Sequence, residues 1–411
     1  MANRPTHEDA ANGEQTAPKK HGKRSWKGRR RNPSNRRDGN TGQASEQPNT
    51  DTKPSDKRHT QKQPGMATHR PRPSTGAKRS GTPNPAATQP QVSKPLSAYA
   101  ALDLGTNNCR LLVATPQQPG RFRVVDAFSR IVRLGEGLGA TGKLSDAAMD
   151  RAVSALKTCA SKLNSRELQG ARLIATEACR RASNGGVFLK RVREETGLEL
   201  EVVDRETEAR LAVSGCASLV DRDASGVVLF DIGGGSSELA LLDLSKRKRH
   251  DLGAAMVSWT SLPFGVVTLS EKHGGGRSVT QDVFDAMVEE VSQAIEDYEG
   301  RDALASVFER GEVHLLGTSG TVTTLAGIHL KLPRYDRRMV DGTWMSSRQI
   351  FEMIDGLVAM GYDERVKNPC IGQDRADLVL AGCAILVAIQ RTWPCERLRV
   401  ADRGLREGLL T

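Results

Sequence analysis

Two short polar turns stand out in this sequence because each combines an aspartate, glycine and small hydrogen-bonding side chains after a hydrophobic segment. The first reads Asp103–Leu104–Gly105–Thr106–Asn107–Asn108, and the second reads Asp231–Ile232–Gly233–Gly234–Gly235–Ser236–Ser237–Glu238. Glycine lets a backbone approach a ligand closely, and N–H groups that converge on one point bind anions. Acids at such a turn supply the hard oxygen ligands that Mg²⁺ requires. These residue types predict a site for a polyanion such as a phosphate chain.

A third turn of related composition is Gly317–Thr318–Ser319–Gly320–Thr321. It joins a hydrophobic strand to a helical segment, and the N-terminus of a helix favours an anion. The motif G-x-x-x-x-G-K-[ST] does not occur, so this is not a P-loop protein. A single turn of this kind is usually an ordinary loop. Three of them at strand ends indicate a shared phosphate site.

The hydrophobic pattern predicts the elements that position these turns. Segments 99–104 and 109–114 are expected to form a hairpin around the first turn, and segments 227–231 and 239–242 flank the second turn in the same way. This repeated unit indicates an internal duplication, and therefore two like-folded α/β lobes around a shared cleft. Further expected strands are 122–128, 171–176, 198–203 and 313–316, and expected helices are 147–164, 186–196, 205–219, 281–299, 322–330 and 348–360.

The charge of the chain is uneven along its length. Residues 1–95 hold 20 of the 60 lysines and arginines, only 7 of the 49 acidic residues and 12 of the 18 prolines. The rest of the chain therefore has a net charge of −2, and the formal +11 belongs to the tail. Such a segment buries too little apolar surface to offset its ordering entropy. We expect a disordered basic tail over residues 1–96, one lobe over residues 97–222 and a second lobe over residues 223–411.

The basic clusters of the tail, such as residues 23–31, suit contact with a polyanion: RNA, polyphosphate or an acidic membrane surface. A solvated, solubilising extension is the alternative interpretation. The sequence shows neither a secretory signal peptide nor a stretch apolar enough to cross a bilayer. Its seven cysteines are scattered without a C-x-x-C pair, which argues for a reducing compartment. These features predict a cytoplasmic protein with no membrane span.

Taken together, three motifs resemble the exopolyphosphatase / guanosine pentaphosphate phosphohydrolase (Ppx/GppA) family. They are D-x-G-T-N-x-x-R-L from Asp103, D-I-G-G-G-S-S-E-L from Asp231 and L-G-T-S-G-T from Leu316. That family belongs to the actin-like, sugar-kinase and Hsp70 ATPase superfamily. The resemblance therefore implies two ribonuclease H-like lobes, as in an actin-like ATPase. Further similar segments are 133–138, 175–184, 206–211 and 404–410, so the resemblance spans about residues 98–411.

The resemblance also implies roles for individual residues. Glu208 matches the family's catalytic glutamate, which would orient or deprotonate the attacking water. Asp231 and Glu238 match the acids that handle the metal and the water. Arg180 matches the arginine that contacts phosphate, and Asn184 is expected one helical turn beyond it.

The turns are implied to bind the phosphate groups, with Asp103 as a third metal ligand. Mg²⁺ or another divalent metal is the expected cofactor. The expected phosphate-binding residues are Gly105, Thr106, Asn107, Asn108, Gly233, Gly234, Gly235, Ser236, Ser237, Gly317, Thr318, Ser319 and Gly320.

The activity implied by the resemblance is hydrolysis of terminal phosphoanhydride bonds with release of orthophosphate. The sequence does not separate polyphosphate from guanosine pentaphosphate as the substrate. Two alternatives remain: a kinase or ATPase of the same superfamily, and a non-catalytic RNA-associated protein that uses the basic tail. The resemblance makes a homodimer an expectation. Long members of the family carry a C-terminal helical HD-type domain, for which no counterpart is seen here, so a short form is expected.

Overall fold

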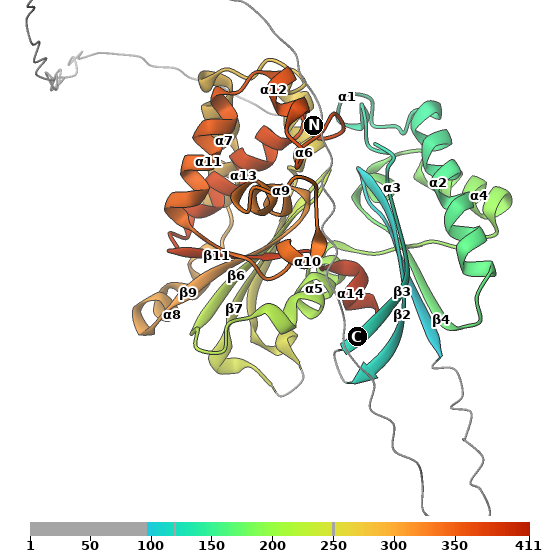
Figure 1. Ribbon diagram of the computed structural model, residues 1–411, viewed down its shortest axis with the longest axis horizontal. Helices are drawn as coiled ribbons and strands as arrows, with labels where there is room; N and C mark the ends of the chain where they lie inside the picture. Colours follow the sequence, from blue (N-terminus) through green and yellow to red (C-terminus); the bar gives the residue numbers. More distant parts are fainter. Residues whose placement is uncertain (1–96, 119–120, 249–250) are drawn as a thin grey trace, which may run out of the picture. The chain divides into compact units, whose positions relative to one another are not determined.

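The computed structural model describes residues 97–411 except 119–120 and 249–250. The predictions made for the basic tail lie outside the described residues. The described part contains two β-sheets with helices packed against them (Figure 1). This arrangement confirms the predicted mixed α/β fold class.

The first sheet has the strand order β3-β2-β1-β4-β5. Strands β1, β2 and β3 are antiparallel neighbours, whereas β4 and β5 run parallel to β1. The sheet strands are β1 (Ala98–Leu104), β2 (Asn108–Gln118), β3 (Arg121–Ile131), β4 (Leu168–Ala175) and β5 (Glu201–Val202). The helices in this part of the sequence are α1 (Leu138–Thr141), α2 (Asp146–Asn164), α3 (Glu177–Arg181), α4 (Gly185–Thr196) and α5 (Arg205–Cys216), of which α5 packs against the second sheet.

The second sheet has the strand order β10-β11-β9-β6-β7-β8. Its strands are β6 (Gly226–Ile232), β7 (Ser237–Asp243), β8 (Met256–Leu262), β9 (Val313–Thr318), β10 (Trp344–Ser346) and β11 (Arg397–Ala401). Its helices are α6 (Val266–Lys272), α7 (Gln281–Glu296), α8 (Ala305–Arg310), α9 (Gly320–His329), α10 (Arg337–Val340), α11 (Ser347–Ala359), α12 (Tyr362–Lys367), α13 (Val379–Thr392) and α14 (Leu405–Leu409).

The two sheets repeat one topology. In each, an antiparallel hairpin leads to a third antiparallel strand, and two later strands pair in parallel on the other side of the first strand. The corresponding orders are β3-β2-β1-β4-β5 and β8-β7-β6-β9-β11, with β10 added at one edge of the second sheet. The duplication inferred from the two turns is therefore a duplication of a whole sheet.

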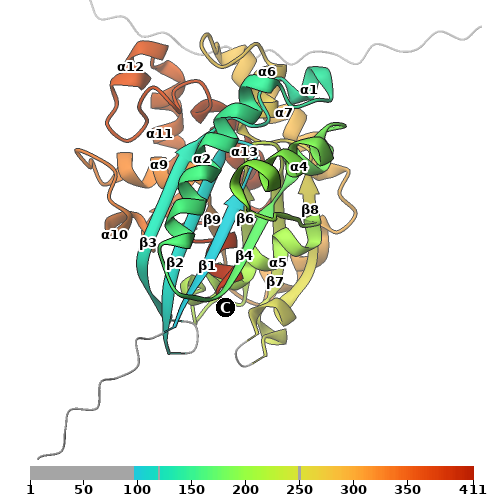
Figure 2. The ribbon, with the colours of Figure 1, turned by 90° about the vertical axis from the view of Figure 1, so that its right-hand side faces the viewer.

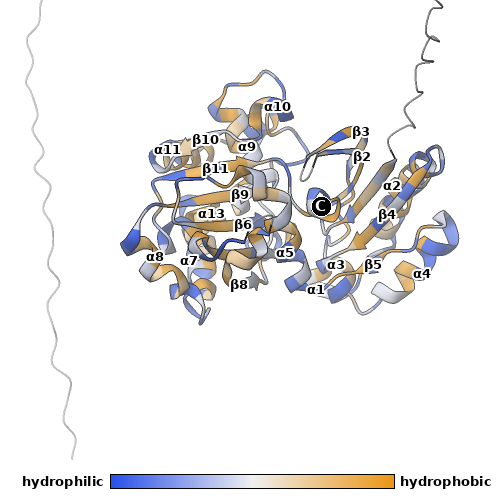
Figure 3. Ribbon diagram, turned by 90° about the horizontal axis from the view of Figure 1, so that it is seen from below, coloured by the Kyte–Doolittle hydropathy of each residue, from blue (hydrophilic) through white to orange (hydrophobic). Residues whose placement is uncertain are grey.

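Three hydrophobic clusters explain why the helices lie where they do. Helix α2 lies along the first sheet (Figure 2). It places Met149, Val153 and Leu156 on one face at helical spacing, and these side chains join the buried cluster of β1 and β2. Helices α7, α9, α11 and α13 cover one face of the second sheet. Strands β6 and β9 of that sheet are largely hydrophobic (Figure 3), as expected for strands buried on both faces.

Helices α5 and α14 cover the other face of the second sheet and pack against each other. Their contact is close because Gly215 of α5 faces the backbone of Gly404, where a Cβ atom would lie 2.0 Å from a carbonyl oxygen. Helix α14 also contacts β1 and β2 of the first sheet (Figure 1). These two helices therefore join the two lobes.

A few predicted elements differ in extent from the observed ones. The strand expected over residues 198–203 is only Glu201–Val202, because just two residues of this segment pair with β4. The helix expected over residues 205–219 ends at Cys216 and continues as a 3₁₀ turn. Within the described residues, no helix is long and apolar enough to span a bilayer.

Candidate active site between the two lobes

The two glycine-containing turns contact each other directly. A Cβ atom on Gly234 would lie 3.0 Å from the backbone nitrogen of Asn107 and 3.0 Å from Cβ of Thr106. A Cβ atom on Gly235 would lie 2.7 Å from Oγ1 of Thr106. The second turn therefore needs glycine for this approach, and the prediction of a shared cleft is confirmed.

Both turns are closed by the same hydrogen bond. The N–H of Gly105 donates to the carbonyl of Asn108 at 2.9 Å, and the N–H of Gly233 donates to the carbonyl of Ser236 at 3.0 Å. The second turn is further held by α6, whose first N–H group at Val266 donates to the carbonyl of Gly233 at 3.0 Å. The carbonyl of Gly233 therefore accepts a hydrogen bond from α6, and neighbouring N–H groups of the turn remain available to a ligand.

Around the turns lies a cleft that encloses about 940 Å³ of empty space, part of it open to solvent. Most of the predicted site residues border it. They are Asp103, Gly105, Thr106, Asn107, Asn108, Glu208, Asp231, Gly233, Gly234, Gly235, Ser236, Glu238, Ser319 and Gly320.

The strand register places different residues opposite the two aspartates. Asp103 pairs with Arg110 across the first hairpin, and Asp231 pairs with Glu238 across the second. Burial raises the pKa of Asp103, although the positive charges of Arg110 and Arg406 counteract that rise. Burial and the nearby negative charge of Glu238 raise the pKa of Asp231 to about 8. Arg110 and Arg406 also counteract the rise in the pKa of Asp231, so the two hairpins differ chiefly in the glutamate that the second places beside its aspartate.

A buried ion-pair cluster holds Glu208. Its Oε2 atom accepts a hydrogen bond from Nη2 of Arg180 at 3.0 Å, and the same nitrogen donates to Glu177 at 2.7 Å. Arg180 also donates through Nη1 to the carbonyl of Val203 at 2.5 Å. Arg180 borders a neighbouring pocket and not the cleft itself, so it reaches the cleft only through Glu208 and Glu177.

Glu208 and Glu238 are both nearly inaccessible to solvent, with 6% and 3% exposed surface. Burial raises the pKa of Glu208 well above its usual range, and the charge of Glu238 adds to this rise against the opposing effect of Arg180. Burial also raises the pKa of Glu238, although its Oε1 atom accepts hydrogen bonds from Ser236 at 2.6 Å and Ser261 at 2.9 Å. Buried carboxyl groups with raised pKa values are suited to accept a proton near neutral pH.

Three predicted phosphate-binding residues do not border the cleft. The hydroxyl of Ser237 is fully buried and donates to the carbonyl of Phe264 at 2.7 Å. Gly317 lies inside β9, where a Cβ atom would come within 2.5 Å of the Phe230 ring. Thr318 donates to the carbonyl of Arg403 at 2.7 Å. Strand β9 extends to Thr318, so the loop that faces the cleft begins only at Ser319.

Asn184 does not lie one helical turn beyond Arg180, as the resemblance implies. Helix α3 ends at Arg181, and Asn184 begins the next helix, α4. Its side-chain amide exchanges two hydrogen bonds of 2.9 Å with the backbone of Leu144. Asn184 therefore fixes the segment that leads into α2, and it does not border the cleft.

Sequence reasoning missed Arg375, which borders the cleft from the loop before α13. Its Nη1 atom donates to Oγ1 of Thr324 at 3.1 Å. Burial and the charge of Arg110 lower the pKa of its guanidinium group. Arg110 and Arg375 are both half-buried at this cleft and their charges repel each other, and an anion bound between them would relieve that repulsion.

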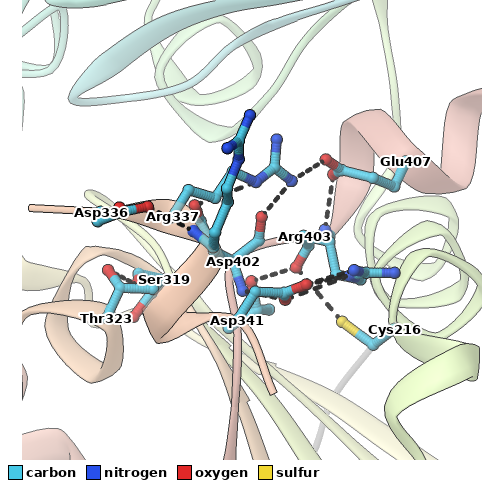
Figure 4. Close-up of polar contacts among 12 residues, drawn as sticks. Cys216, Ser319, Thr323, Asp336, Arg337, Asp341, Asp402, Arg403 and Glu407 are labelled. Atoms are coloured by element: carbon cyan, nitrogen blue, oxygen red, sulfur yellow. Dashed lines mark hydrogen bonds and ion pairs between the residues drawn. The ribbon is translucent and has the colours of Figure 1, made fainter. Parts of the chain in front are cut away.

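A polar network behind the cleft fixes the segment that leads into α14 (Figure 4). Arg337 donates to Glu407 at 2.7 Å and to the carbonyl of Asp402, and the second carboxylate oxygen of Glu407 accepts from the N–H of Gly404 at 2.9 Å. Burial would raise the pKa of Glu407, but the charges of Arg406 and Arg337 hold it below its usual range. The network thereby anchors the helix that carries Arg406 toward Asp103.

The oxygen atoms at the cleft determine whether the site can hold a divalent metal. Asp103, Asp231 and Glu238 border one cleft, and the buried Oδ1 atom of Asn107 has no hydrogen-bond partner. Among the described residues, however, no three His, Cys, Asp or Glu side chains lie ready to hold a metal by themselves. Mg²⁺ in phosphate sites commonly uses one or two carboxylates together with substrate phosphates and water. The residues present fit such a metal, which shares its ligands with a substrate.

Two sheets of this topology around a cleft define an actin-like ATPase fold, and the carboxylates and glycine turns in the cleft define a phosphate site. The chain belongs to the Ppx/GppA phosphatase family, whose model matches residues 113–411.

Solved structures agree with this assignment. A Ppx/GppA family member from Aquifex aeolicus is 28% identical, with 77% of this chain and 97% of that chain covered and a TM-score of 0.62. An exopolyphosphatase-like protein is 26% identical, with 76% and 97% covered and a TM-score of 0.66. An exopolyphosphatase from Cytophaga hutchinsonii is 24% identical, with 76% and 96% covered and a TM-score of 0.67, and it supports the fold alone.

Proposed function

We propose that this chain hydrolyses the terminal phosphoanhydride bonds of polyphosphate or of a guanosine polyphosphate and releases orthophosphate. The observation that carries the proposal is the meeting of two anion-binding turns with Glu208 and Glu238 at one cleft. Membership of the phosphatase family supports it at the level of reaction class. The relative from Aquifex aeolicus supports it at the level of the family.

The turns and the arginines account for binding of the substrate. Backbone N–H groups at Gly234 and Gly235 and the hydroxyl of Thr106 are available to phosphate oxygens. Arg110 and Arg375 border the same cleft and offset the negative charge of a phosphate chain. Phosphoryl transfer depends mainly on such positioning and charge neutralisation, with little covalent chemistry from the protein.

Glu208 is the residue proposed to accept a proton from the attacking water. The water oxygen forms a bond to the terminal phosphorus, and the bond from that phosphorus to the bridging oxygen breaks. The electron pair leaves with the shortened chain, and the proton passes to Glu208 and then to solvent. Arg180 orients the Glu208 carboxylate through its 3.0 Å hydrogen bond, and Glu177 holds Arg180 in turn.

A divalent metal held by Asp103, Asp231 and Glu238 together with substrate phosphates would supply further neutralisation of the transition-state charge. Members of the family generally depend on such a metal. Burial, together with the charges of Glu238 and Asp103, raises the pKa of Asp231, so a bound cation would stabilise the ionised forms of these acids.

The proposal is tested by orthophosphate release from short polyphosphate, long polyphosphate and guanosine pentaphosphate, each with Mg²⁺ and with excess chelator. We expect Mg²⁺-dependent release from at least one substrate without any acceptor. Glu208→Gln should reduce that release by at least ~100-fold. Glu194→Gln should retain it, because Glu194 is exposed on α4, pairs with Lys190 and does not border the cleft. No release from any substrate, or release only when an acceptor hydroxyl is added, would contradict the proposal.

A further inference from the structure

A second pocket lies behind the catalytic carboxylates and has no role in the reaction as proposed above. This outer pocket is bordered by Glu177, Arg180, Arg181, Asp204, Arg205, Glu206 and Trp259. It encloses about 790 Å³ of empty space, part of it open to solvent. Three of its seven residues are arginines, and one is a tryptophan.

The outer pocket shares a wall with the main cleft. Glu177 borders both, and the guanidinium of Arg180 bridges Glu177 on one side and Glu208 on the other. On strand β8, Trp259 and Ser261 are two residues apart and therefore point to the same face of the sheet. Ser261 donates to Glu238 at 2.9 Å. The outer pocket is thus next to both buried carboxylates of the active site.

The charged groups of the outer pocket differ in how far they are already paired. Glu177 accepts from Arg180 and Arg205, Glu206 pairs with Arg210, and the carboxylate of Asp204 caps α5 by accepting from the N–H of Thr207. Among the residues that the structure describes, Arg181 has no acidic partner, and Arg205 uses only Nη2. Guanidinium donors without partners therefore remain, and they suit a phosphate dianion.

In-line displacement fixes the direction in which the product forms. The attacking water approaches the terminal phosphorus from the side opposite the leaving chain, and the phosphoryl group moves toward that water as the bond forms. The water lies at Glu208 in the proposed reaction, so orthophosphate is produced against the wall formed by Glu208, Arg180 and Glu177. The remaining chain still fills the cleft on the other side of the product.

We infer that the outer pocket binds the released orthophosphate through the guanidinium groups of Arg181 and Arg205 on its way to solvent. This inference rests on the proposed function for the origin of the phosphate, but binding in the pocket is measurable without turnover. The chemistry recognised is a phosphate dianion. It has two sources, the product orthophosphate and the end of a polyphosphate chain, and the experiment separates them.

The test uses the tryptophan of the pocket as a reporter. Inorganic phosphate is titrated into the full-length protein while tryptophan emission is followed, with Trp259→Phe as the variant that lacks the reporter. We expect a saturable change that Trp259→Phe abolishes. Arg181→Gln should weaken the apparent affinity for phosphate at least about fivefold, and Arg205→Gln should weaken it as well. Arg193→Gln, an exposed arginine on α4, is the matched control and should leave the titration unchanged.

Two results would overturn the inference. One is a phosphate titration that Arg181→Gln leaves unchanged while Arg375→Gln abolishes it, which places phosphate in the main cleft only. The other is a titration with tripolyphosphate that gives the same Arg181-dependent signal at lower concentration, which assigns the pocket to a chain end. Thermal unfolding of Arg181→Gln verifies that this exposed substitution leaves the fold intact.

Product inhibition by orthophosphate provides a second test of the inference, and this test depends on turnover. If orthophosphate binds in the outer pocket while a new substrate occupies the cleft, product inhibition is mixed, and Arg181→Gln raises the inhibition constant at least about fivefold. Purely competitive inhibition by orthophosphate in the wild-type protein would contradict the inference about the outer pocket. It would not contradict the proposed hydrolytic function. Absence of turnover on every substrate would instead refute the proposed function, and the fluorescence titration would still decide whether the pocket binds phosphate.

Discussion

The two hairpin turns share one construction and differ in the residue opposite their aspartate. Each aspartate precedes a turn closed by the same backbone hydrogen bond, from Gly105 to Asn108 and from Gly233 to Ser236. Asp103 faces an arginine across its hairpin, whereas Asp231 faces a glutamate. The two copies of a duplicated element therefore differ in the charge opposite their aspartate, while burial raises the pKa of both aspartates and Arg110 and Arg406 counteract that rise in both.

This difference suggests a division of labour. The first hairpin brings a cation, Arg110, to the cleft and is suited to hold the negative charge of a phosphate chain. The second hairpin brings two acids together in a buried place, and the pKa of Asp231 rises to about 8 as a result. Close acids are costly without a cation, so the second hairpin is suited to metal and proton chemistry.

The largest expected effect is on the acid of the second hairpin. Glu238→Gln keeps the hydrogen bonds from Ser236 and Ser261 possible but removes the negative charge. We expect kcat to fall by ~100-fold or more, with a smaller change in KM, because a charge that acts in the transition state is lost. Steady-state phosphate release measures both constants. A variant that changes KM alone would show that the second hairpin binds the substrate and does not take part in the chemistry.

The matching change on the first hairpin should act mainly on binding. Arg110→Gln removes a guanidinium that borders the cleft, and we expect KM to rise by about tenfold with less change in kcat. Arg123→Gln on β3 is the control, because Arg123 is exposed and lies outside the cleft. If Arg110→Gln lowered kcat as much as Glu238→Gln, the proposal that the first hairpin acts in binding and the second in the chemistry would be contradicted.

The contrast also predicts how pH affects metal binding. Asp231 must lose its proton to bind a cation, and its pKa of about 8 means that the carboxyl is mostly protonated below that pH. Affinity for Mg²⁺ should therefore rise with pH by up to about tenfold per unit and level off above about 8. In Glu238→Gln the repulsion from Glu238 is absent, and the plateau should begin at lower pH. Isothermal titration at several pH values measures this, and a pH-independent affinity would exclude Asp231 as a ligand.

The same raised pKa has a consequence for stability that can be followed by thermal unfolding. A carboxyl with a pKa above its unfolded value favours the folded state at low pH, and this contribution is lost as pH rises from 3.8 to about 8. The metal-free protein should be less stable at pH 8 than at pH 6 through this group, and Mg²⁺ should stabilise it more at pH 8. Asp231→Asn should abolish this difference.

The smallest expected effect concerns the contact between the turns. Gly234→Ala places a methyl group 3.0 Å from three atoms of the first turn, so one turn must move by a few tenths of an ångström. We expect a loss of about 1 kcal/mol in the free energy of unfolding and a several-fold loss of activity. Gly139→Ala in α1 meets no atom within 4 Å and is the control. Equal behaviour of the two variants would mean that the turns do not need to touch.

Much of this arrangement was predictable because it is local in the sequence. An aspartate, a glycine turn and flanking hydrophobic alternation specify a hairpin, so both hairpins and their cleft-facing residues followed from the pattern. The role of Gly317 could not be predicted from the pattern. Glycine is needed at this position to leave room for the Phe230 ring, and only the packing of the folded chain reveals this. Arg375 lies on a segment without a distinctive motif. A tertiary contact with Thr324 holds it at the site, and no local pattern reports such a contact.

The central claim is that both turns hold one phosphate chain at the same time. Hydrogen exchange of backbone amides in Glu208→Gln, with and without Mg²⁺ and tripolyphosphate, tests it most directly. The claim predicts that exchange slows together at residues 105–108 and 233–237 when the ligand binds. Slowing at one turn alone, under conditions where binding is saturated, would contradict it.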